Sequence, residues 1–415
     1  MLSQDPVIQF FSIYSAIYAA KVKKIIIFIC AFKKSFLPLR KTFEMSYPSI
    51  DKIQSLLASS TFGYASDNKK AAGRALGTFV EIITFYLLKT WNLEHFLAIE
   101  RPLPEFANNE ITHNVEFTLH GKKAFYNCKF NETDIPINSN FIKKQIENDG
   151  ILFKNSTILD KNLIRKNACT IAAFDGGFIN AYLDEKSEEL QCISLKDKPF
   201  AMFECKRVGV EEGMKKGPQT IEKAKQGSYV ARTVSALQRI RKEDGKIYGC
   251  IFDDNGNCII DEYYKLCRQI IETDKPSLLR NFILTIGVIS NHGNWFTAEN
   301  MNKELKVLAQ SYDWLVFLTD DGLVKFITEL LINPQKEYEA VKTAFEKSYS
   351  ADKKINMFTK SKIGLDADIA LTKYFQENIS AVEKWFNVIS PNGAALSDLK
   401  DDLQKLSQKN YWEIY

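Results

Sequence analysis

Two neighbouring apolar segments that end in charge are the feature of this sequence that most constrains its fold. The first covers residues 170–174 and leads into Asp175; the second covers residues 199–203 and leads into Glu204, Cys205 and Lys206. Segments of this length and composition, bounded by turn residues, are typical of buried strands. Charge at the end of a core strand requires a reason, so these residues are candidates for a functional site.

Side chains alternate across a strand, so Glu204 and Lys206 point to one face and Cys205 points to the other. The Gly176–Gly177 pair after Asp175 permits a tight turn. The chain can then fold back and bring Asp175 close to the Glu204 strand, which predicts three ionisable groups at one sheet edge. The alternative is a surface hairpin with an exposed Glu–Lys pair, which the apolar flanks disfavour.

Composition limits the functional classes. The 415 residues carry a net charge of only +4, so any basic surface that binds nucleic acid has to be local. The eight cysteines form no CxxC pair, which favours reduced thiols and a cytoplasmic location. Only four histidines are present, so a histidine-rich metal site is not expected.

The order of an Asp, a strand and a Glu-x-Lys pair resembles the PD-(D/E)xK nuclease superfamily, whose best-known members are type II restriction endonucleases. Asp175, Glu204 and Lys206 carry the resemblance, and Phe174 stands where the superfamily name has Pro. The resemblance implies an α/β fold with a restriction-endonuclease-like core, in which helices flank a mixed central sheet. Runs of buried-strand character at 282–290 and 314–318 supply the last strands of such a sheet.

The resemblance also implies a Mg²⁺ cofactor, because this ion prefers a few carboxylates together with water and phosphate oxygens. Asp175, Glu204 and the backbone carbonyl of Cys205 would hold it, and Lys206 would orient or deprotonate the attacking water. Helical periodicity at 69–91 predicts a helix that carries Glu81. In the superfamily a helix at this place often adds a metal-binding carboxylate; the alternative is a solvated Glu81.

A second predicted helix, at 219–241, follows the Glu-x-Lys strand. Its Gln226 and Tyr229 resemble a pair of residues that the superfamily places beside the site. Gln226 is therefore predicted to be one of the catalytic residues. Basic residues here suit a phosphate backbone, and the alternative is a solvated lysine-rich face. The predicted DNA-binding residues are Lys215, Lys216, Lys223, Lys225, Tyr229 and Arg232.

Three regions are expected. Residues 1–44 are apolar and basic, with runs too short to span a membrane, and form either a dispensable extension or a membrane-surface helix. Residues 45–332 form the nuclease domain, with an insertion at 99–168 that holds either target-contacting loops or a peripheral β-region. Residues 333–415 form a helical C-terminal region.

The expected function is that of a Mg²⁺-dependent type II restriction endonuclease that cuts double-stranded DNA at a short site. It would act as a homodimer beside a separate cognate DNA methyltransferase, without a membrane. The alternatives are a repair or mobile-element nuclease of the same fold and a non-catalytic DNA-binding protein.

Overall fold

The computed structural model describes residues 49–146, 150–184, 189–209, 218–292, 303–349 and 355–409. Residues from Ile50 onward belong to one compact unit. The N-terminal segment 1–44 lies outside the described residues, and so do Lys215 and Lys216.

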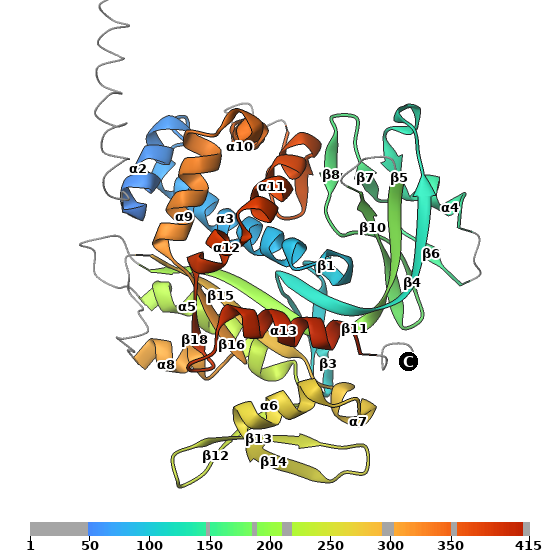
Figure 1. Cartoon of the computed structure of the whole chain (residues 1–415), viewed down its shortest axis with the longest axis vertical. Coiled ribbons are helices and arrows are strands. Elements are labelled where there is room, and N and C mark those ends of the chain that lie inside the picture. The colour runs from blue at the N-terminus through green and yellow to red at the C-terminus, as the bar shows by residue number, and fades with distance from the viewer. Residues whose placement is uncertain are drawn as a thin grey trace, which may run out of the picture. The chain divides into compact units, whose positions relative to one another are not determined.

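A nine-stranded mixed sheet forms the centre of this unit (Figure 1), as the α/β prediction expects. Its longest strand, β11 (Glu189–Gly209), runs antiparallel to β10 and β4 over its first part and parallel to β15 over its last part. The sheet therefore changes from antiparallel to parallel along a single strand. The other strands are β1 (Leu97–Ile99), β4 (Phe117–Lys129), β6 (Leu152–Phe153), β9 (Cys169–Phe174), β10 (Gly177–Leu183), β15 (Leu284–His292), β16 (Trp314–Leu318) and β18 (Phe386–Ser390).

Helices pack on both faces of this sheet. The predicted helix at 69–91 is confirmed as α3 (Asn68–Thr90), whose N-cap residue Asp67 accepts the backbone N–H of Lys70 at 2.9 Å. On the α3 face the thiol of Cys205 reaches Thr84, whereas Met202 points to the other face and packs with Val230 of α5 (Pro218–Thr233). Further helices are α2 (Ile50–Ser60), α7 (Pro276–Leu279), α8 (Lys303–Ala309) and α9 (Asp320–Ile327).

Helix α3 is the one helix among the described residues that is long and apolar enough to cross a membrane. Its most apolar window is 67% buried inside the protein. This burial identifies α3 as a core helix, because a helix that is apolar on all sides is a core element when protein covers it.

The helix expected at 219–241 ends earlier, at Thr233. The chain turns there, with the Ala236 N–H donating to the Asn281 carbonyl at 2.8 Å. Residues 238–241 then form a strand, because their backbone groups pair with a neighbouring strand and their side chains alternate. This three-stranded sheet, with β12 (Gln238–Arg241), β13 (Ile247–Phe252) and β14 (Cys258–Glu262), lies against α6 (Tyr263–Glu272) apart from the central sheet (Figure 1).

The expected insertion at 99–168 is not wholly peripheral, because it contains the strands β4 and β6 of the central sheet. Its remaining elements are the hairpin of β2 (Pro102–Glu105) and β3 (Asn108–Asn114), helix α4 (Ser139–Lys143), and β5 (Ile137–Asn138), β7 (Thr157–Leu159) and β8 (Ile164–Lys166).

The C-terminal region is mainly helical, as expected, but two of its strands join other parts of the fold. Strand β18 pairs antiparallel with β16 at the edge of the central sheet, and β17 (Lys362–Gly364) pairs with β8 of the insertion. The boundary expected at 332 therefore does not separate a helical region from the sheet. The helices are α10 (Glu339–Ser348), α11 (Leu365–Glu377), α12 (Ile379–Val382) and α13 (Leu396–Ser407).

A buried ion network ties these regions together. Asp368 of α11 is fully buried, and its carboxylate contacts Arg165 of β8 at 2.5 Å, Lys89 of α3 at 3.3 Å and the Tyr86 hydroxyl at 2.7 Å. Burial raises the pKa of Asp368, but the two cations outweigh it and hold this pKa below its ordinary value. The carboxylate is thus ionised in the folded protein and fully compensated.

We expect Asp368→Asn to lower the free energy of unfolding by about 3 to 5 kcal/mol near pH 7, because Arg165 and Lys89 would lose their buried counter-ion. The folded-state pKa is depressed, so the stabilisation is present above the ordinary carboxyl pKa of about 4 and is lost as the pH falls through the folded-state pKa. Urea unfolding of both proteins should therefore give a constant difference from pH 5 to 8 and a shrinking one below. A pH-independent difference would contradict this account.

Candidate active site

The Glu-x-Lys pair lies on β11 between the two helical layers. Glu204 is 5% exposed, and its carboxylate contacts the Lys206 ammonium at 2.6 Å. Glu204 and Lys206 share one face of the strand and Cys205 faces α3, as the alternation predicts. The second carboxylate oxygen of Glu204 is buried without a hydrogen-bond partner. A buried acceptor of this kind is available to a ligand.

Two glycines let other groups approach Glu204 closely. A Cβ at Gly227 of α5 would lie 2.6 Å from both Glu204 Cγ and the Tyr312 hydroxyl. Gly287 on β15 is paired with Glu204, and a Cβ there would lie 2.8 Å from the Tyr312 ring. Helix, tyrosine and strand therefore hold the Glu204 side chain from the α5 face, with no space for a larger residue at either glycine.

A second acid, Glu116, faces this pair. The antiparallel register of β4 and β11 pairs Phe117 with Phe203, so Glu116, one residue earlier in the chain, lies beside Glu204. Its carboxylate is 3.5 Å from the Lys206 ammonium. The local sequence carried a signal: Glu116 sits between the buried Val115 and Phe117 at the start of an apolar strand.

Asp175 is not in this cluster, which corrects the expectation that it joins Glu204. It is exposed in the turn between β9 and β10, where Gly177 pairs with Lys196. Glu204 lies eight residues further along β11, which at ~3.3 Å per residue is roughly 25 Å away. The Gly176–Gly177 turn does form, with Gly176 at φ +74°, but it meets β11 at Lys196 and Asp197, in the middle of the strand and short of Glu204.

Glu81 of α3 lines the same hollow as Glu116 and Lys206, and its use as a metal ligand stays a prediction. An unexpected lysine, Lys360, joins it to Glu116: the Lys360 ammonium contacts Glu116, lies 3.2 Å from Glu81 and 3.1 Å from Glu100. The C-terminal region supplies this lysine and the loop after β1 supplies Glu100. Neither residue stands out in the local sequence pattern, since Glu100 has the opposite charge of Arg101 beside it and Lys360 is one of two lysines in a short polar stretch.

Burial sets the electrostatics of these acids. It raises the pKa of Glu204, and the Lys206 ammonium opposes this only in part. The pKa of Glu81 is also raised by burial, against the opposing charges of Lys360 and Lys206. Both carboxylates are therefore under-compensated and would gain from an additional cation.

The predicted residues of α5 differ in their position relative to the site. Gln226 is exposed on α5 and lines the same hollow as Glu81, Glu116 and Lys206. Tyr229 is 52% exposed and its ring meets His113 of β3, and the Arg232 guanidinium donates to the Ser228 carbonyl of its own helix. The side chains of Lys223 and Lys225 lie outside the described part of the structure.

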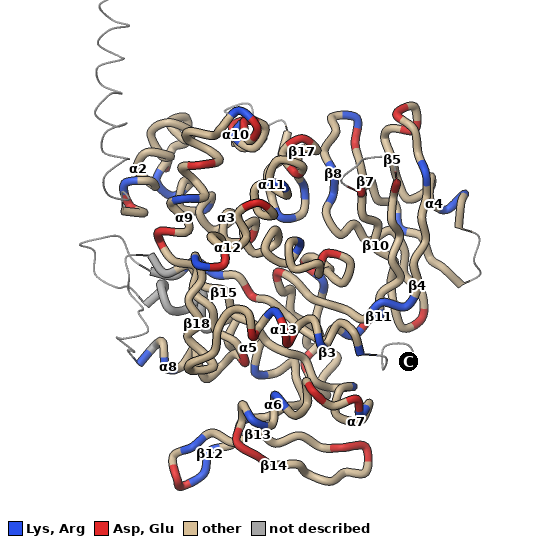
Figure 2. The backbone as a smooth tube through the Cα atoms, viewed as in Figure 1, with Lys and Arg blue, Asp and Glu red and all other residues tan. Residues whose placement is uncertain are grey.

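The hollow beside Lys206 measures about 780 Å³ and carries both signs of charge. Charges are otherwise interspersed along the chain (Figure 2), in keeping with the small net charge. In the hollow, however, cations gather at one end: the exposed Lys69, Lys70 and Arg74 on the first turns of α3, and Arg207, which donates to Gln54 at 2.9 Å. The local sequence does not predict this group, because Arg207 lies far along the chain from Lys69, Lys70 and Arg74.

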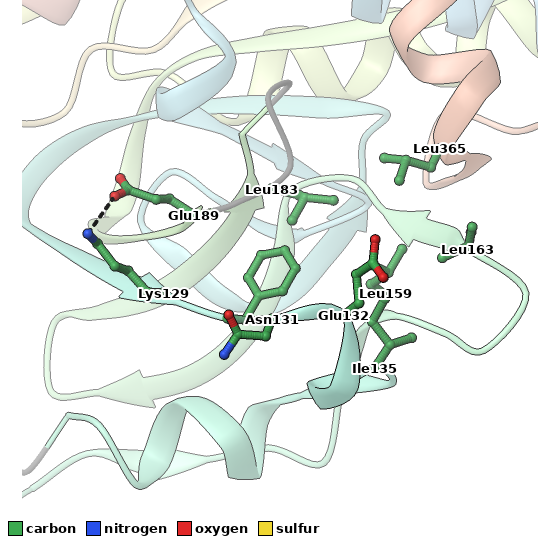
Figure 3. Close-up of a pocket in the computed structure, with 10 residues that line it drawn as sticks. Lys129, Asn131, Glu132, Ile135, Leu159, Leu163, Leu183, Glu189 and Leu365 are labelled. Carbon is green, nitrogen blue, oxygen red and sulfur yellow. Dashed lines mark ion pairs between the residues drawn. The ribbon is translucent and has the colours of Figure 1, made fainter.

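A second hollow, of about 630 Å³, lies in the insertion (Figure 3). Ile135, Leu159 and Leu365 form apolar walls, and Lys129 and Glu189 make an ion pair of 3.9 Å at one side. Its described lining contains no histidine, cysteine or aspartate. Glu81, Glu116 and Lys206 line the hollow beside the Glu-x-Lys pair and not this one.

The donors beside Lys206 are oxygens of the type that a hard divalent cation prefers. Glu81, Glu116 and Glu204 offer carboxylate oxygens, the ligand type that Mg²⁺ prefers, and the unpartnered oxygen of Glu204 is one available donor. Within the described residues no three His, Cys, Asp or Glu side chains gather around one point as a metal centre requires. The point between Glu81 and Glu116 is where the Lys360 ammonium lies.

A scan against protein-family models, a search of curated proteins and a search of solved structures each found no match to this chain. The residues and their geometry therefore carry the functional interpretation by themselves.

We expect Gly227→Ala to destabilise the protein by about 1 to 3 kcal/mol, because the new methyl group would displace Glu204 or Tyr312. Gly77→Ala is the matched control: it also lies in a helix beside the hollow, but its Cβ would meet nothing within 4 Å. That control should be stabilised by up to about 1 kcal/mol. Urea unfolding measures both, and equal effects would refute the close packing at Gly227.

Proposed function

We propose that this protein is a divalent-cation-dependent nuclease that hydrolyses phosphodiester bonds of double-stranded DNA. The observation that carries the proposal is the cluster of Glu81, Glu116, Glu204 and Lys206, which comes from one helix and two antiparallel strands. It retains the predicted Glu-x-Lys pair and replaces Asp175 by Glu116. Paired carboxylates beside a cationic hollow repel phosphate unless a metal ion joins them, which disfavours a purely binding role.

The order of elements supports a restriction-endonuclease-like core. Helix α3 precedes the antiparallel pair of β4 and β11, helix α5 follows, and β15 and β16 then add parallel strands. This order agrees with the one that the resemblance to PD-(D/E)xK nucleases implies. The acids lie where the sheet changes from antiparallel to parallel, so their positions follow from the strand order.

Each residue has a definite chemical part in this proposal. Glu81, Glu116 and Glu204 would hold Mg²⁺, with the carbonyl of Cys205 as a further ligand, and the bound ion would polarise the phosphate and acidify water. Lys206, already between Glu204 and Glu116, would orient the attacking water or accept its proton. Gln226 lines the same hollow, where its amide can hydrogen-bond a phosphate oxygen or water.

The cations on α3 suggest the path of the nucleic acid. Lys70 and Arg74 are four residues apart and so lie on the same side of the helix, at the end of the hollow away from Glu81. Phosphates bound there would extend the backbone towards Lys206, since phosphate contacts set register and orientation.

A type II restriction endonuclease is the narrower form of the proposal, with a homodimer, a separate methyltransferase and a cytoplasmic location. Free thiols at all seven cysteines of the described chain support a reducing compartment. A repair or mobile-element nuclease would share the same site, and only the pattern of cleavage separates the two. Discrete DNA fragments indicate a specific target, whereas continuous degradation indicates none.

A second candidate is a DNA-binding protein without catalysis. One observation favours it: the Lys360 ammonium occupies the centre of Glu81, Glu100 and Glu116, where it neutralises acids that a metal would otherwise join. This candidate predicts DNA binding that does not need Mg²⁺ and no cleavage.

We expect purified protein to cut plasmid DNA with Mg²⁺ and not with EDTA. Glu116→Gln and Lys206→Ala should each lower the rate at least about a hundredfold, because both remove a group from the reacting centre. Asp175→Asn should retain the wild-type rate, since the turn that carries Asp175 meets β11 near Lys196, eight residues before Glu204.

Gel assays of all four proteins at equal concentration, with circular dichroism to check folding, provide the measurement. Loss of cleavage in Asp175→Asn with full activity in Glu116→Gln would restore the site expected from the sequence alone. Absence of cleavage by the wild type with many DNA substrates would favour the binding protein.

We expect the double variant Lys70→Ala/Arg74→Ala to bind DNA more weakly at low salt. The slope of log affinity against log salt should become shallower by about 1.8, or ~0.9 for each lost phosphate contact. Replacing the exposed Lys336 and Lys384 of the C-terminal region by Ala makes a control with the same charge change. Equal slopes in the two double variants, measured by fluorescence anisotropy, would remove α3 from the DNA path.

A further inference from the structure

A hydrogen-bonded turn positions Lys360 beside the carboxylates of Glu81 and Glu116. The Thr359 N–H donates to the Lys362 carbonyl at 2.8 Å, and the Lys362 N–H donates to the Thr359 hydroxyl at 3.0 Å. Lys360 and Ser361 therefore form the tip of the turn. The following strand, β17, pairs with β8 of the insertion, so the turn is the end of a hydrogen-bonded structure.

The tip is also held from two sides. Asn167 donates its side-chain amide to the Lys360 carbonyl at 2.9 Å and its N–H to the Ser361 carbonyl at 3.0 Å. Phe358, which precedes the turn, is fully buried against Phe79 of α3, with ring centroids 6.3 Å apart. Glu81 lies two residues after Phe79 on the same helix. The backbone that carries Lys360 is thus fixed relative to α3.

The Lys360 side chain is only 6% exposed and is saturated by acids. An ammonium group has three N–H donors, and this one faces the carboxylates of Glu81, Glu100 and Glu116. Glu100 adopts the left-handed backbone region, at φ +52°, which non-glycine residues rarely adopt. This rare backbone conformation occurs at an acid that contacts the buried Lys360 ammonium, which indicates that the surrounding fold holds the ion pair in place.

We propose that Lys360 is an internal counter-ion that competes with the divalent cation for Glu81 and Glu116, so that metal binding requires its displacement. The inference rests on the proposed metal-dependent function and adds its regulation. Without the ammonium the three carboxylates would repel one another, and with it they attract a metal ion less. Glu100, with a side chain 60% exposed, can keep the displaced ammonium at the rim.

The test compares Lys360→Met with Lys362→Met, an exposed lysine of the same turn that contributes backbone bonds only. Mn²⁺ binding to each DNA-free protein is measured by electron paramagnetic resonance titration. Lys360→Met should bind Mn²⁺ about tenfold to about a thousandfold more tightly than wild type, the range by which one close charge changes the affinity of a site for a proton. Lys362→Met should bind as wild type does.

A measurement on the wild-type chain covers the case that Lys360→Met does not fold. Acetylation of lysines followed by mass spectrometry should show Lys360 protected without metal and several times more reactive with saturating Mg²⁺, while Lys362 reacts equally in both conditions. Unchanged protection of Lys360 with Mg²⁺ would overturn the inference. Equal or weaker Mn²⁺ binding by a folded Lys360→Met, or no binding by either protein, would overturn it as well.

These results are independent of DNA cleavage. If Lys360→Met gains Mn²⁺ affinity and neither protein cuts DNA, the proposed nuclease function fails and the counter-ion stands. If the wild type cuts DNA with Mg²⁺ and the variant binds Mn²⁺ no more tightly, the counter-ion fails alone.

Discussion

The antiparallel pairing of β4 with β11 is the constraint on which the site depends. It fixes Phe117 opposite Phe203 and thereby sets Glu116 next to Glu204 and Lys206. A slip of one residue would turn every side chain of β4 to the other face and remove Glu116 from the cluster. The apolar residues around it resist such a slip, since Val115, Phe117 and Phe203 are all buried. Core packing and the proposed chemistry therefore depend on the same register.

The helices on the two faces of β11 have different parts in this arrangement. Helix α3 carries Glu81, and its first turns present cations to the same hollow. Helix α5 closes over Glu204 through Gly227 and leaves one carboxylate oxygen unpartnered. Burial raises the pKa of Glu81 and of Glu204, and the ammonium groups of Lys206 and Lys360 oppose this effect only in part. An additional cation would therefore stabilise the ionised carboxylates of Glu81 and Glu204.

The C-terminal region supports the core and also reaches the site. Asp368 of α11 neutralises Arg165 of β8, and Ile363 of β17 pairs with Arg165 in the adjoining ladder. Three residues before Ile363 lies Lys360, among the acids. The turn that carries this lysine is therefore anchored to the most completely buried ion network in the described part of the chain. Its position is a consequence of the fold rather than of a mobile side chain.

Local sequence determined the elements and several of their functional faces. The 3.6-residue period fixed α3 and put Glu81 on it, the apolar runs became β11, β15 and β16, and the period of two put Glu204 and Lys206 on one face of a strand. These features depend on neighbours within a turn or a strand, and such neighbours are visible in the chain.

Only the tertiary structure decided which acid joins the pair. Asp175 and Glu116 both border apolar strands that adjoin β11, one on each edge: β10 pairs with residues 190–196 and β4 with residues 189–203. Pairing partners and registers depend on contacts far apart in sequence, so no local pattern selects between the two acids. Lys360 and β18 reach the core for the same reason, because ion pairing and strand pairing in three dimensions bring together segments that lie far apart in the chain.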